Sequence, residues 1–212
     1  FVLRHAAGEF PSGTVHLAVV DPGVGTQRRP LALGADDQLW VGPDNGLFSF
    51  ILDRDDTRVH HITRRDLYSP RPSSTFHGRD IFAPIAAHLS SGLDLAEVGP
   101  PIADPVYLPE TTPNKFVERI EGQIIHIDRF GNLVTNIAAA DIEPWGTELR
   151  IRLGAYLLDG LSQTYADVEA GAPLALIGSV DLLEISVNGG SAAQQLGLDR
   201  RDSILIEKNA QR

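Results

Sequence analysis

The hydrophobic pattern of this chain changes across one proline-rich stretch, and that change restricts the possible folds more than any other feature. Between Gly99 and Pro113 the sequence carries five prolines and little periodicity. Strand-like and helix-like segments alternate before this stretch, whereas short strand-like runs dominate after it. We therefore predict two domains, an α/β domain over residues 1–112 and a β-rich domain over residues 113–212.

The alternating pattern of the first part indicates a layered α/β domain. The predicted helices span residues 1–7, 47–52 and 79–89, and the predicted strands span residues 14–20, 30–33 and 38–41. Pro84 lies inside the last of these helices, so a kink is expected there.

Short runs of alternating residues in the second part indicate a small all-β domain. The predicted strands span residues 116–127, 149–153, 173–177, 182–187 and 203–207, with one helix at 192–196. Many short strands at close spacing are typical of a small barrel or of a sandwich, and the pattern by itself leaves both open.

Charge and composition exclude several classes of protein. The 28 acidic and 18 basic residues leave a net charge of −10, which argues against nucleic acid as a partner and favours a cationic small molecule. No apolar run reaches the ~20 residues that cross a bilayer, so no membrane association is expected. Cysteine is absent, which excludes disulfides and thiolate chemistry and fits a cytoplasmic protein. Methionine is absent too, so we expect the natural chain to begin upstream of Phe1.

Three residues of complementary chemistry lie in two short segments of the predicted α/β domain. Asp21 directly follows the strand-like run, Arg28 lies further along the same loop, and His77 lies within Thr75–Asp80. A carboxylate, a permanent cation and an imidazole are the groups that can hold and polarise a water molecule. Ligands bind at the carboxyl ends of strands in open α/β sheets, which is where Asp21 is expected. Taken alone, the residues after Val20 are also explained by an ordinary β-turn with structural Arg and His side chains nearby.

Other common site motifs are missing from the sequence. The glycines at 23 and 25 lack the third glycine of a dinucleotide loop, and no Gly-x-Ser-x-Gly motif occurs. The histidines show no metal-binding spacing with each other or with carboxylates. We therefore predict a site that uses neither a metal nor a redox cofactor.

A second set of candidate residues lies in the predicted β-rich domain. In the tight turn 127–132, Phe130 can stack on a purine, Asn132 can hydrogen bond to it, and Asp128 can pair with an ammonium group. An ordinary hairpin turn stabilised by Asp and Asn explains the same residues equally well. Further polar side chains flank a later strand-like run, at Ser179, Glu184 and Asn188.

Five ordered segments, spread over nearly the whole chain, together resemble the S-adenosylmethionine hydrolase (hydroxide adenosyltransferase) family, whose relatives include fluorinating and chlorinating enzymes. The segments are Val-Asp-Pro-Gly-Val-Gly at 20–25, Pro-Asp-Asn-Gly-Leu at 43–47, Thr-Phe-His-Gly-Arg-Asp at 75–80, Ile-Asp, Phe-Gly-Asn and Thr-Asn within 127–136, and Gly-Ser through Val-Asn at 178–188. Each segment alone is a weak signal, whereas the ordered set is specific.

The resemblance implies an N-terminal α/β domain joined to a C-terminal β-barrel. It also implies a homotrimer that binds a small-molecule substrate between the α/β domain of one subunit and the barrel of its neighbour. Members of the family usually begin with a strand that ends in Thr-Asp-Phe-Gly, and such a segment would lie upstream of Phe1.

The resemblance assigns roles to residues that the chemistry had already singled out. Asp21, Arg28 and His77 match the residues that position a water molecule in the family. Substrate contacts are expected at Thr75, Phe76, Asp128, Phe130, Asn132, Tyr165, Ser179, Glu184, Val187 and Asn188.

The implied reaction is hydrolysis of S-adenosyl-L-methionine to adenosine and L-methionine by in-line attack of water on the 5′ carbon. Either Asp21 or His77 would accept the proton, and the sequence leaves that choice open. In halogenating relatives, the positions that match Asp21 and His77-Gly78 of this chain resemble Tyr and Tyr-Ser. A carboxylate at position 21 also repels an incoming halide. Hydrolysis is therefore favoured over halogenation, and a nucleoside-binding protein without catalysis is the alternative from a different class.

Overall fold

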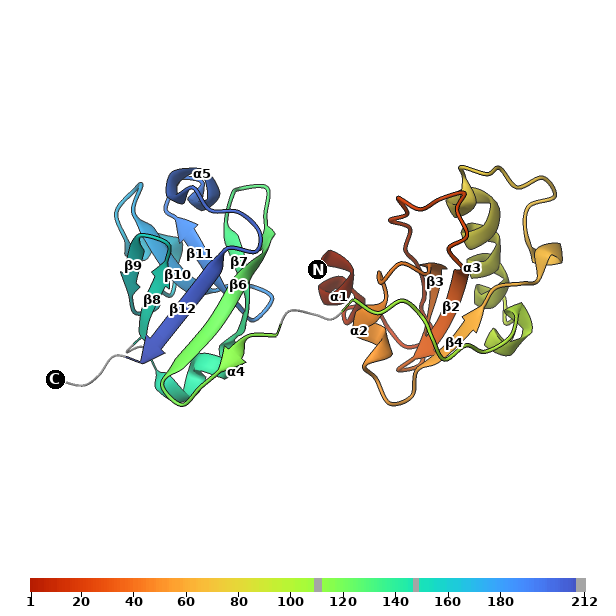
Figure 1. Ribbon diagram of the computed structural model, residues 1–212, viewed down its shortest axis with the longest axis horizontal. Coiled ribbons are helices and arrows are strands. Elements are labelled where there is room, and N and C mark those ends of the chain that lie inside the picture. Colours follow the sequence, from red (N-terminus) through yellow and green to blue (C-terminus); the bar gives the residue numbers. More distant parts are fainter. Residues whose placement is uncertain (109–111, 147–148, 209–212) are drawn as a thin grey trace. The chain divides into compact units, whose positions relative to one another are not determined.

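Two compact units make up the chain, and each has a hydrophobic core of its own (Figure 1). The computed structural model describes residues 1–108, 112–146 and 149–208. The α/β unit spans residues 2–110, and the barrel unit spans residues 111–212 together with Phe1. Residues 109–111 of the predicted linker lie outside the described residues.

A four-stranded mixed sheet in the order β1-β3-β2-β4 forms the centre of the α/β unit. Its strands are β1 (Val15–Leu17), β2 (Pro30–Ala35), β3 (Gln38–Pro43) and β4 (Arg58–His61). Strand β1 runs parallel to β3, whereas β2 pairs antiparallel with both β3 and β4. The sheet is therefore mixed, with a parallel pair at the edge where β1 leads toward Asp21.

Helices pack on both faces of this sheet. Because side chains alternate between the faces of a strand, Leu31 and Leu33 of β2 pack with Ile51 on one face while Ala32 packs with Ile85 on the other. The helices are α1 (Val2–Ala7), α2 (Ser49–Leu52) and α3 (Ala83–Ser90), with 3₁₀ turns at Arg65–Leu67 and Leu95–Val98. The predicted layered α/β class is confirmed.

The predicted helix 79–89 is built from two segments of different type. A π-helical turn, Gly78–Phe82, precedes α3, and Pro84 lies in the first turn of α3, where a missing N–H group costs little. The carbonyl of Asp80, which that N–H would have bonded, instead accepts the amide of Ser69 at 2.9 Å. Pro84 therefore lies at a junction between two helix types, not inside one α-helix as the sequence predicted.

The first part of the predicted linker is bonded to the α/β unit. The amide of Ile102 donates to the carbonyl of Val59 at 2.9 Å, and the amide of Val106 donates to Asp44 Oδ1 at 2.7 Å. The amide of Leu108 donates to a serine hydroxyl in α2 at 2.8 Å. Residues 99–108, the first part of the predicted linker, therefore form a strap that is held along the sheet and α2.

An eight-stranded antiparallel sheet forms the barrel unit, in the order β10-β11-β7-β6-β12-β8-β9, with β5 also paired to β6. The strands are β5 (Asn114–Lys115), β6 (Arg119–Ile127), β7 (Leu133–Ala138), β8 (Leu149–Leu153), β9 (Tyr156–Asp159), β10 (Pro173–Ile177), β11 (Leu182–Val187) and β12 (Ser203–Lys208). Short helices lie at α4 (Ala139–Ile142), α5 (Ala192–Leu196), Glu143–Trp145 and Tyr165–Asp167. Irregular registers between β6 and β7 and between β7 and β11 bend the sheet. The two ends of the sheet, β9 and β10, contact each other, so the structure is barrel-like rather than a sandwich.

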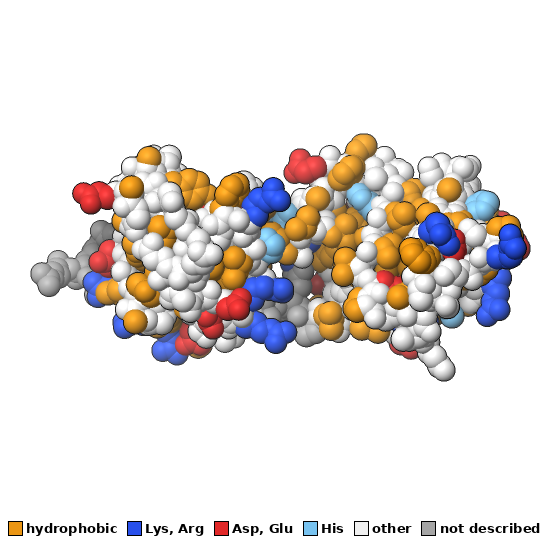
Figure 2. Space-filling view, turned by 90° about the horizontal axis from the view of Figure 1, so that it is seen from above, with side chains coloured by type: hydrophobic (Ala, Val, Ile, Leu, Met, Phe, Trp, Pro, Cys, Tyr) orange, Lys and Arg blue, Asp and Glu red, His pale blue; other side chains and the backbone are white. Residues whose placement is uncertain are grey.

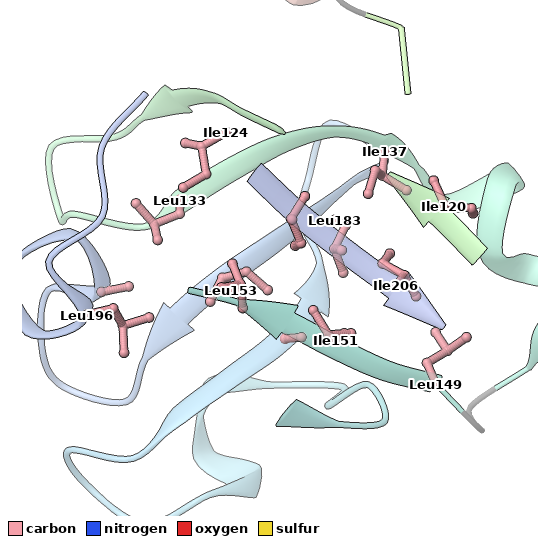
Figure 3. Packing of buried hydrophobic residues seen from close by; sticks show 14 of the residues in the cluster. Ile120, Ile124, Leu133, Ile137, Leu149, Ile151, Leu153, Leu183, Leu196 and Ile206 are labelled. Atoms are coloured by element: carbon pink, nitrogen blue, oxygen red, sulfur yellow. The ribbon is translucent and has the colours of Figure 1, made fainter. Parts of the chain in front are cut away.

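Alternating apolar residues fill the interior of the barrel unit. Ile206 of β12, Ile151 and Leu153 of β8, Leu133 of β7 and Leu183 of β11 are all fully buried and point toward one another (Figure 3). This period of two is the pattern that predicted strands from the sequence. It holds because one face of each strand meets the core, and along β8 and β12 the other face is at least partly exposed.

The observed strands differ from the predicted ones in two ways: one strand is shorter than predicted, and four strands were not predicted. The run 14–20 is a strand only as β1, because the chain leaves the sheet after one further bond from the amide of Ala18 to the carbonyl of Val41 at 3.0 Å. Sequence reasoning missed β4, β5, β7 and β9. In β7 a threonine interrupts the apolar pattern, yet Thr135 is fully buried because its hydroxyl donates to the carbonyl of Leu183 at 2.9 Å.

Candidate active site

The loop after β1 folds back on itself and so brings its two charged residues together. The amide of Val24 donates to the carbonyl of Asp21 at 3.2 Å, and the amide of Thr26 donates to the carbonyl of Gly23 at 3.1 Å. Gly25 has φ +78°, and a Cβ atom there would lie 2.7 Å from the carbonyl oxygen of Ser74, so a glycine is required where this loop meets the segment before His77.

Asp21, Arg28 and His77 form one hydrogen-bonded chain. Arg28 Nε donates to Asp21 Oδ1 at 2.9 Å, and Arg28 Nη2 contacts Asp21 Oδ2. The same Nη2 lies 2.8 Å from Nδ1 of His77, which is 49 residues away in the sequence. The side chains of Arg28 and Asp21 are 9% and 5% exposed. The structure therefore brings together the three residues that the sequence predicted to act on water.

His77 is held as a neutral imidazole of defined tautomer. Burial lowers the pKa of His77 below its ordinary value of 6.5, and the Arg28 guanidinium lowers it further, against smaller opposing effects of Asp21 and Asp80. A guanidinium can only donate hydrogen bonds, so Nδ1 of His77 must accept from Arg28. The ring proton therefore resides on Nε2, which can donate to a bound molecule.

Thr75 and Phe76 lie exposed beside His77. The Phe76 side chain is 58% exposed, and the guanidinium of Arg79 lies 5.0 Å from the centre of its ring. The Thr75 amide donates to the Ser73 hydroxyl at 3.3 Å. An exposed aromatic ring next to a buried polar chain is suited to stacking on a planar ligand.

Asp80 is a supporting residue to which sequence reasoning assigned no role. Its buried carboxylate accepts Arg79 Nε at 2.7 Å and the amide of Ser73 at 2.8 Å. These bonds, from Arg79 first and Ser73 second, lower the pKa of Asp80 to about 2. Asp80 therefore stays charged and fixes the segment that carries His77. The sequence feature that could have indicated this role is an acidic residue directly before the core residues Ile81 and Phe82.

In the barrel unit, Asp128 organises the turn after β6. Its Oδ1 accepts the amides of Phe130 at 2.8 Å and Asn132 at 2.9 Å, and its Oδ2 accepts Nδ2 of Asn132 at 2.9 Å. The Phe130 ring is 71% exposed. The turn thus presents an aromatic ring to solvent while the carboxylate and the amide hold its shape, as an ordinary hairpin would also do.

A buried carboxylate lies close to this turn. Glu184 Oε1 accepts the hydroxyls of Tyr165 at 2.9 Å and Ser186 at 2.8 Å. Burial, together with Glu184 and then Asp128, raises the pKa of Tyr165 to about 12, so its phenol remains a neutral donor. Ser186, fully buried on β11, was missed by sequence reasoning because nothing in a strand pattern marks a serine that bonds to a neighbour on the same face.

The remaining predicted contacts occupy different environments. Ser179 is exposed in the turn between β10 and β11, and Nδ2 of Asn188 donates to the carbonyl of Val168 at 2.8 Å. The Val187 side chain is 3% exposed and packs in the barrel core. A contact between Val187 and a ligand would therefore use its backbone.

The candidate residues form two clusters, one in each unit. Across the described residues, no three His, Asp or Glu side chains come together as metal ligands. In the same part of the chain, no helix combines the length and the apolar character that a bilayer span requires.

The fold and the two polar clusters define a two-domain protein that joins an α/β unit to a small antiparallel barrel. Two family models match it, the SAM hydroxide adenosyltransferase N-terminal domain over residues 1–99 and the corresponding C-terminal domain over residues 122–205. The chain belongs to the SAM hydroxide adenosyltransferase family.

Individual relatives agree with this assignment. An (R)-S-adenosyl-L-methionine hydrolase of Thermus thermophilus is 40% identical over 93% of this chain and 77% of its own length. A crystal structure of an uncharacterized conserved protein from Thermotoga maritima superimposes with a TM-score of 0.88 at 36% identity, covering 97% of this chain and 81% of its own. A fluorinase of Nocardia brasiliensis is more distant, with 29% identity over 93% of this chain and 78% of its own length.

Proposed function

We propose that this chain hydrolyses S-adenosyl-L-methionine to adenosine and L-methionine. Its family and the hydrolase of Thermus thermophilus support the substrate and the reaction. The observation that carries the mechanism is the hydrogen-bonded chain Asp21–Arg28–His77, which combines a fixed carboxylate with an imidazole whose Nδ1 faces the Arg28 guanidinium.

The reaction forms one bond to the 5′ carbon and breaks another. The oxygen of water attacks the 5′ carbon, the bond from that carbon to sulfur breaks, and the electron pair leaves with sulfur as the neutral thioether of methionine. The attacking water loses one proton. Because the leaving group departs uncharged, the reaction needs no Lewis acid on it, and we propose that no metal or redox cofactor takes part.

Within this proposal, Asp21 is the better placed proton acceptor. The lone pair of His77 Nδ1 is already used by Arg28, so His77 acts through its Nε2–H group, as a donor that orients the water. The Asp21 oxygens bond to Arg28, and each retains a second lone pair. Arg28 remains a cation and favours hydroxide character in the bound water.

The substrate contacts proposed for the rest of the site follow the charges of the two clusters. The substrate carries a sulfonium and an ammonium group, and the barrel cluster offers the carboxylates Asp128 and Glu184. The exposed rings of Phe76 and Phe130 are suited to the adenine. The further contacts belong to Thr75, Asn132, Tyr165, Ser179, Val187 and Asn188.

Product analysis in isotopic water tests the reaction. In H₂¹⁸O the enzyme is expected to release adenosine that carries one ¹⁸O at the 5′ position, together with unlabelled methionine, as measured by mass spectrometry. The substrate should be the (R)-sulfonium form, which the name of the Thermus relative specifies. Parallel reactions with chloride or fluoride decide the alternatives. Halogenated deoxyadenosine as the main product would refute hydrolysis, and tight calorimetric binding of adenosine without turnover would indicate a binding protein.

We further propose a homotrimer whose active sites combine the α/β unit of one subunit with the barrel unit of the next. Apolar side chains reach the surface of both units (Figure 2). Among the residues expected to touch substrate, Phe76, Phe130 and Tyr165 are exposed in the single chain, which supports a site completed by a second copy. A cytoplasmic location stays a prediction from the sequence.

Light scattering checks the assembly, because a trimer has three times the mass of the 23.0 kDa chain. Mixing two impaired variants, Asp21→Asn and Asp128→Ala, at a low substrate concentration and allowing subunits to exchange is then expected to raise the activity above that of either variant. A monomer at working concentration, or a mixture no more active than its components, would contradict the shared site.

A further inference from the structure

We propose that Asp44 and Asn45 are positioning residues that hold the two ends of the loop 20–29 and thereby align Asp21 and Arg28 with His77. This inference rests on the proposed hydrolysis, but it concerns two residues outside the reacting groups. Both belong to the turn that follows β3, which neither the chemistry of the sequence nor the family resemblance placed in the site.

Asn45 holds the beginning of the loop. Its Nδ2 donates to the carbonyl of Val20 at 2.8 Å, and Val20 directly precedes Asp21. The Oδ1 of the same side chain accepts the amide of Leu47 at 3.2 Å, which fixes the direction of the amide group. Asn45 therefore ties the last residue before Asp21 to the rigid end of β3.

Asp44 holds the end of the loop. Its amide donates to the carbonyl of Arg29 at 2.9 Å, and its Oδ2 accepts Nε of Arg29 at 2.7 Å. Arg29 directly follows Arg28, and its guanidinium also donates to Asp104 Oδ1 at 2.8 Å. The backbone carbonyl of Arg29 is thus bonded to the Asp44 amide, and its guanidinium is bonded to the buried Asp44 carboxylate.

The turn that carries this pair is itself immobilised. The Asp44 side chain is 3% exposed, and its Oδ1 accepts the amide of Val106 at 2.7 Å. Gly46 has φ +86°, and a Cβ atom there would lie 2.3 Å from Cγ of Leu108, so the strap packs directly on the turn. The pair is therefore a fixed reference point rather than part of a mobile surface.

Anchoring both ends matters because the two backbone hydrogen bonds inside the loop, from Val24 to Asp21 and from Thr26 to Gly23, join only its own residues. Arg28 Nη2 and His77 Nδ1 lie 2.8 Å apart. This contact holds only while the loop and the segment before His77 keep their relative positions. A displacement of about 1 Å in a catalytic group is enough to cost ~100-fold in rate. Loosening one end of the loop should therefore reduce turnover without removing any reacting group.

Two uncharged variants of Asn45 test this. Asn45→Ser keeps an oxygen for the Leu47 amide but cannot reach the Val20 carbonyl, and Asn45→Ala removes both bonds. Both are expected to lower kcat by about 10-fold or more while KM stays within about 2-fold, since the substrate contacts are intact. Asn114→Ser, an exposed asparagine of β5, is the matched control and should leave kcat and KM unchanged.

The titration of His77 gives a readout that does not depend on activity. The charged groups facing His77 are Arg28, Asp21 and Asp80. If Arg28 moves away in the Asn45 variants, the pKa of His77 measured by NMR on the substrate-free protein should rise toward 6.5, with the histidine assigned by a His77 variant. The same rise should be absent in Asn114→Ser.

Failure of this inference differs from failure of the proposed function. Wild-type kcat and an unchanged His77 titration in Asn45→Ser would overturn the positioning role, as would a loss of kcat with the titration unmoved. If the wild-type protein forms no adenosine, the proposed function fails, while the His77 titration of the Asn45 variants still decides whether the turn aligns Arg28.

Discussion

Replacing His77 by alanine is expected to slow adenosine formation by about 10²- to 10⁴-fold, the range typical of a group that transfers a proton or orients a nucleophile. Asp21→Asn should cost at least as much, because it removes the proposed proton acceptor and leaves the Arg28 guanidinium without its countercharge in a site where the two side chains are 9% and 5% exposed. Both variants should still bind substrate, as calorimetry can measure. Adenosine release followed by chromatography gives the rates.

Matched controls are available on the surface of the same unit. His88 is exposed on α3, and Asp66 forms an exposed pair with Arg64. His88→Ala and Asp66→Asn should leave the rate unchanged, since exposed pairs contribute little. Turnover at the wild-type rate in both His77→Ala and Asp21→Asn would refute the assignment of the water site.

The pH profile of the wild-type rate follows from the contact between Arg28 and His77. The pKa of His77 is lowered below 6.5 by burial and by Arg28, so the imidazole stays neutral at neutral pH. Protonation at lower pH would place an N–H group at Nδ1 against the Arg28 guanidinium and break the chain. The rate should therefore decline as the pH falls, with a midpoint below 6.5.

Asp128→Ala is expected to weaken substrate binding by about 10- to 100-fold and to lower the free energy of unfolding by about 1–3 kcal/mol. The stability loss arises because three donors, the amides of Phe130 and Asn132 and the Nδ2 of Asn132, lose their acceptor. The loss of affinity arises because a carboxylate no longer faces a cationic substrate. Calorimetry measures the binding, and urea unfolding measures the stability.

Asp128→Asn separates these two effects. It keeps an oxygen for the amides of Phe130 and Asn132, so most of the stability should return, while the charge and the affinity should not. Affinity that recovers together with stability would show that Asp128 serves the shape of the turn alone, which is the ordinary hairpin explanation.

Much of the fold could be predicted from local pattern, for a physical reason that particular elements illustrate. Strands β8, β11 and β12 were predicted because one face of each is apolar at a period of two, and that face is the barrel core. Strand β9 was missed because it is mostly exposed, and β4 because it is short and carries two histidines. Pairing across the sheet stabilises such strands, and pairing leaves no trace in the local sequence.

The candidate site was predictable in its residue types but not in its contacts. Asp21, Arg28 and His77 were recognisable because a carboxylate, a cation and an imidazole follow strand and loop signals in a known order of motifs. Their chemical states were not predictable, since the tautomer of His77 depends on a bond to a residue 49 positions away. Asp80 and Ser186 were missed for the same reason, because each acts through neighbours that only folding supplies.

The sequence by itself determined the two-domain organisation, the family and which residues are proposed to bind water, since these depend on periodicity, composition and the order of motifs along the chain. Only the tertiary structure decided that Arg28 bridges Asp21 and His77, that the buried Glu184 accepts the hydroxyl of Tyr165, and that Asp44 and Asn45 bond to the ends of the loop. Such contacts arise when distant segments close onto one another, and their geometry follows from packing of the whole unit rather than from any local preference.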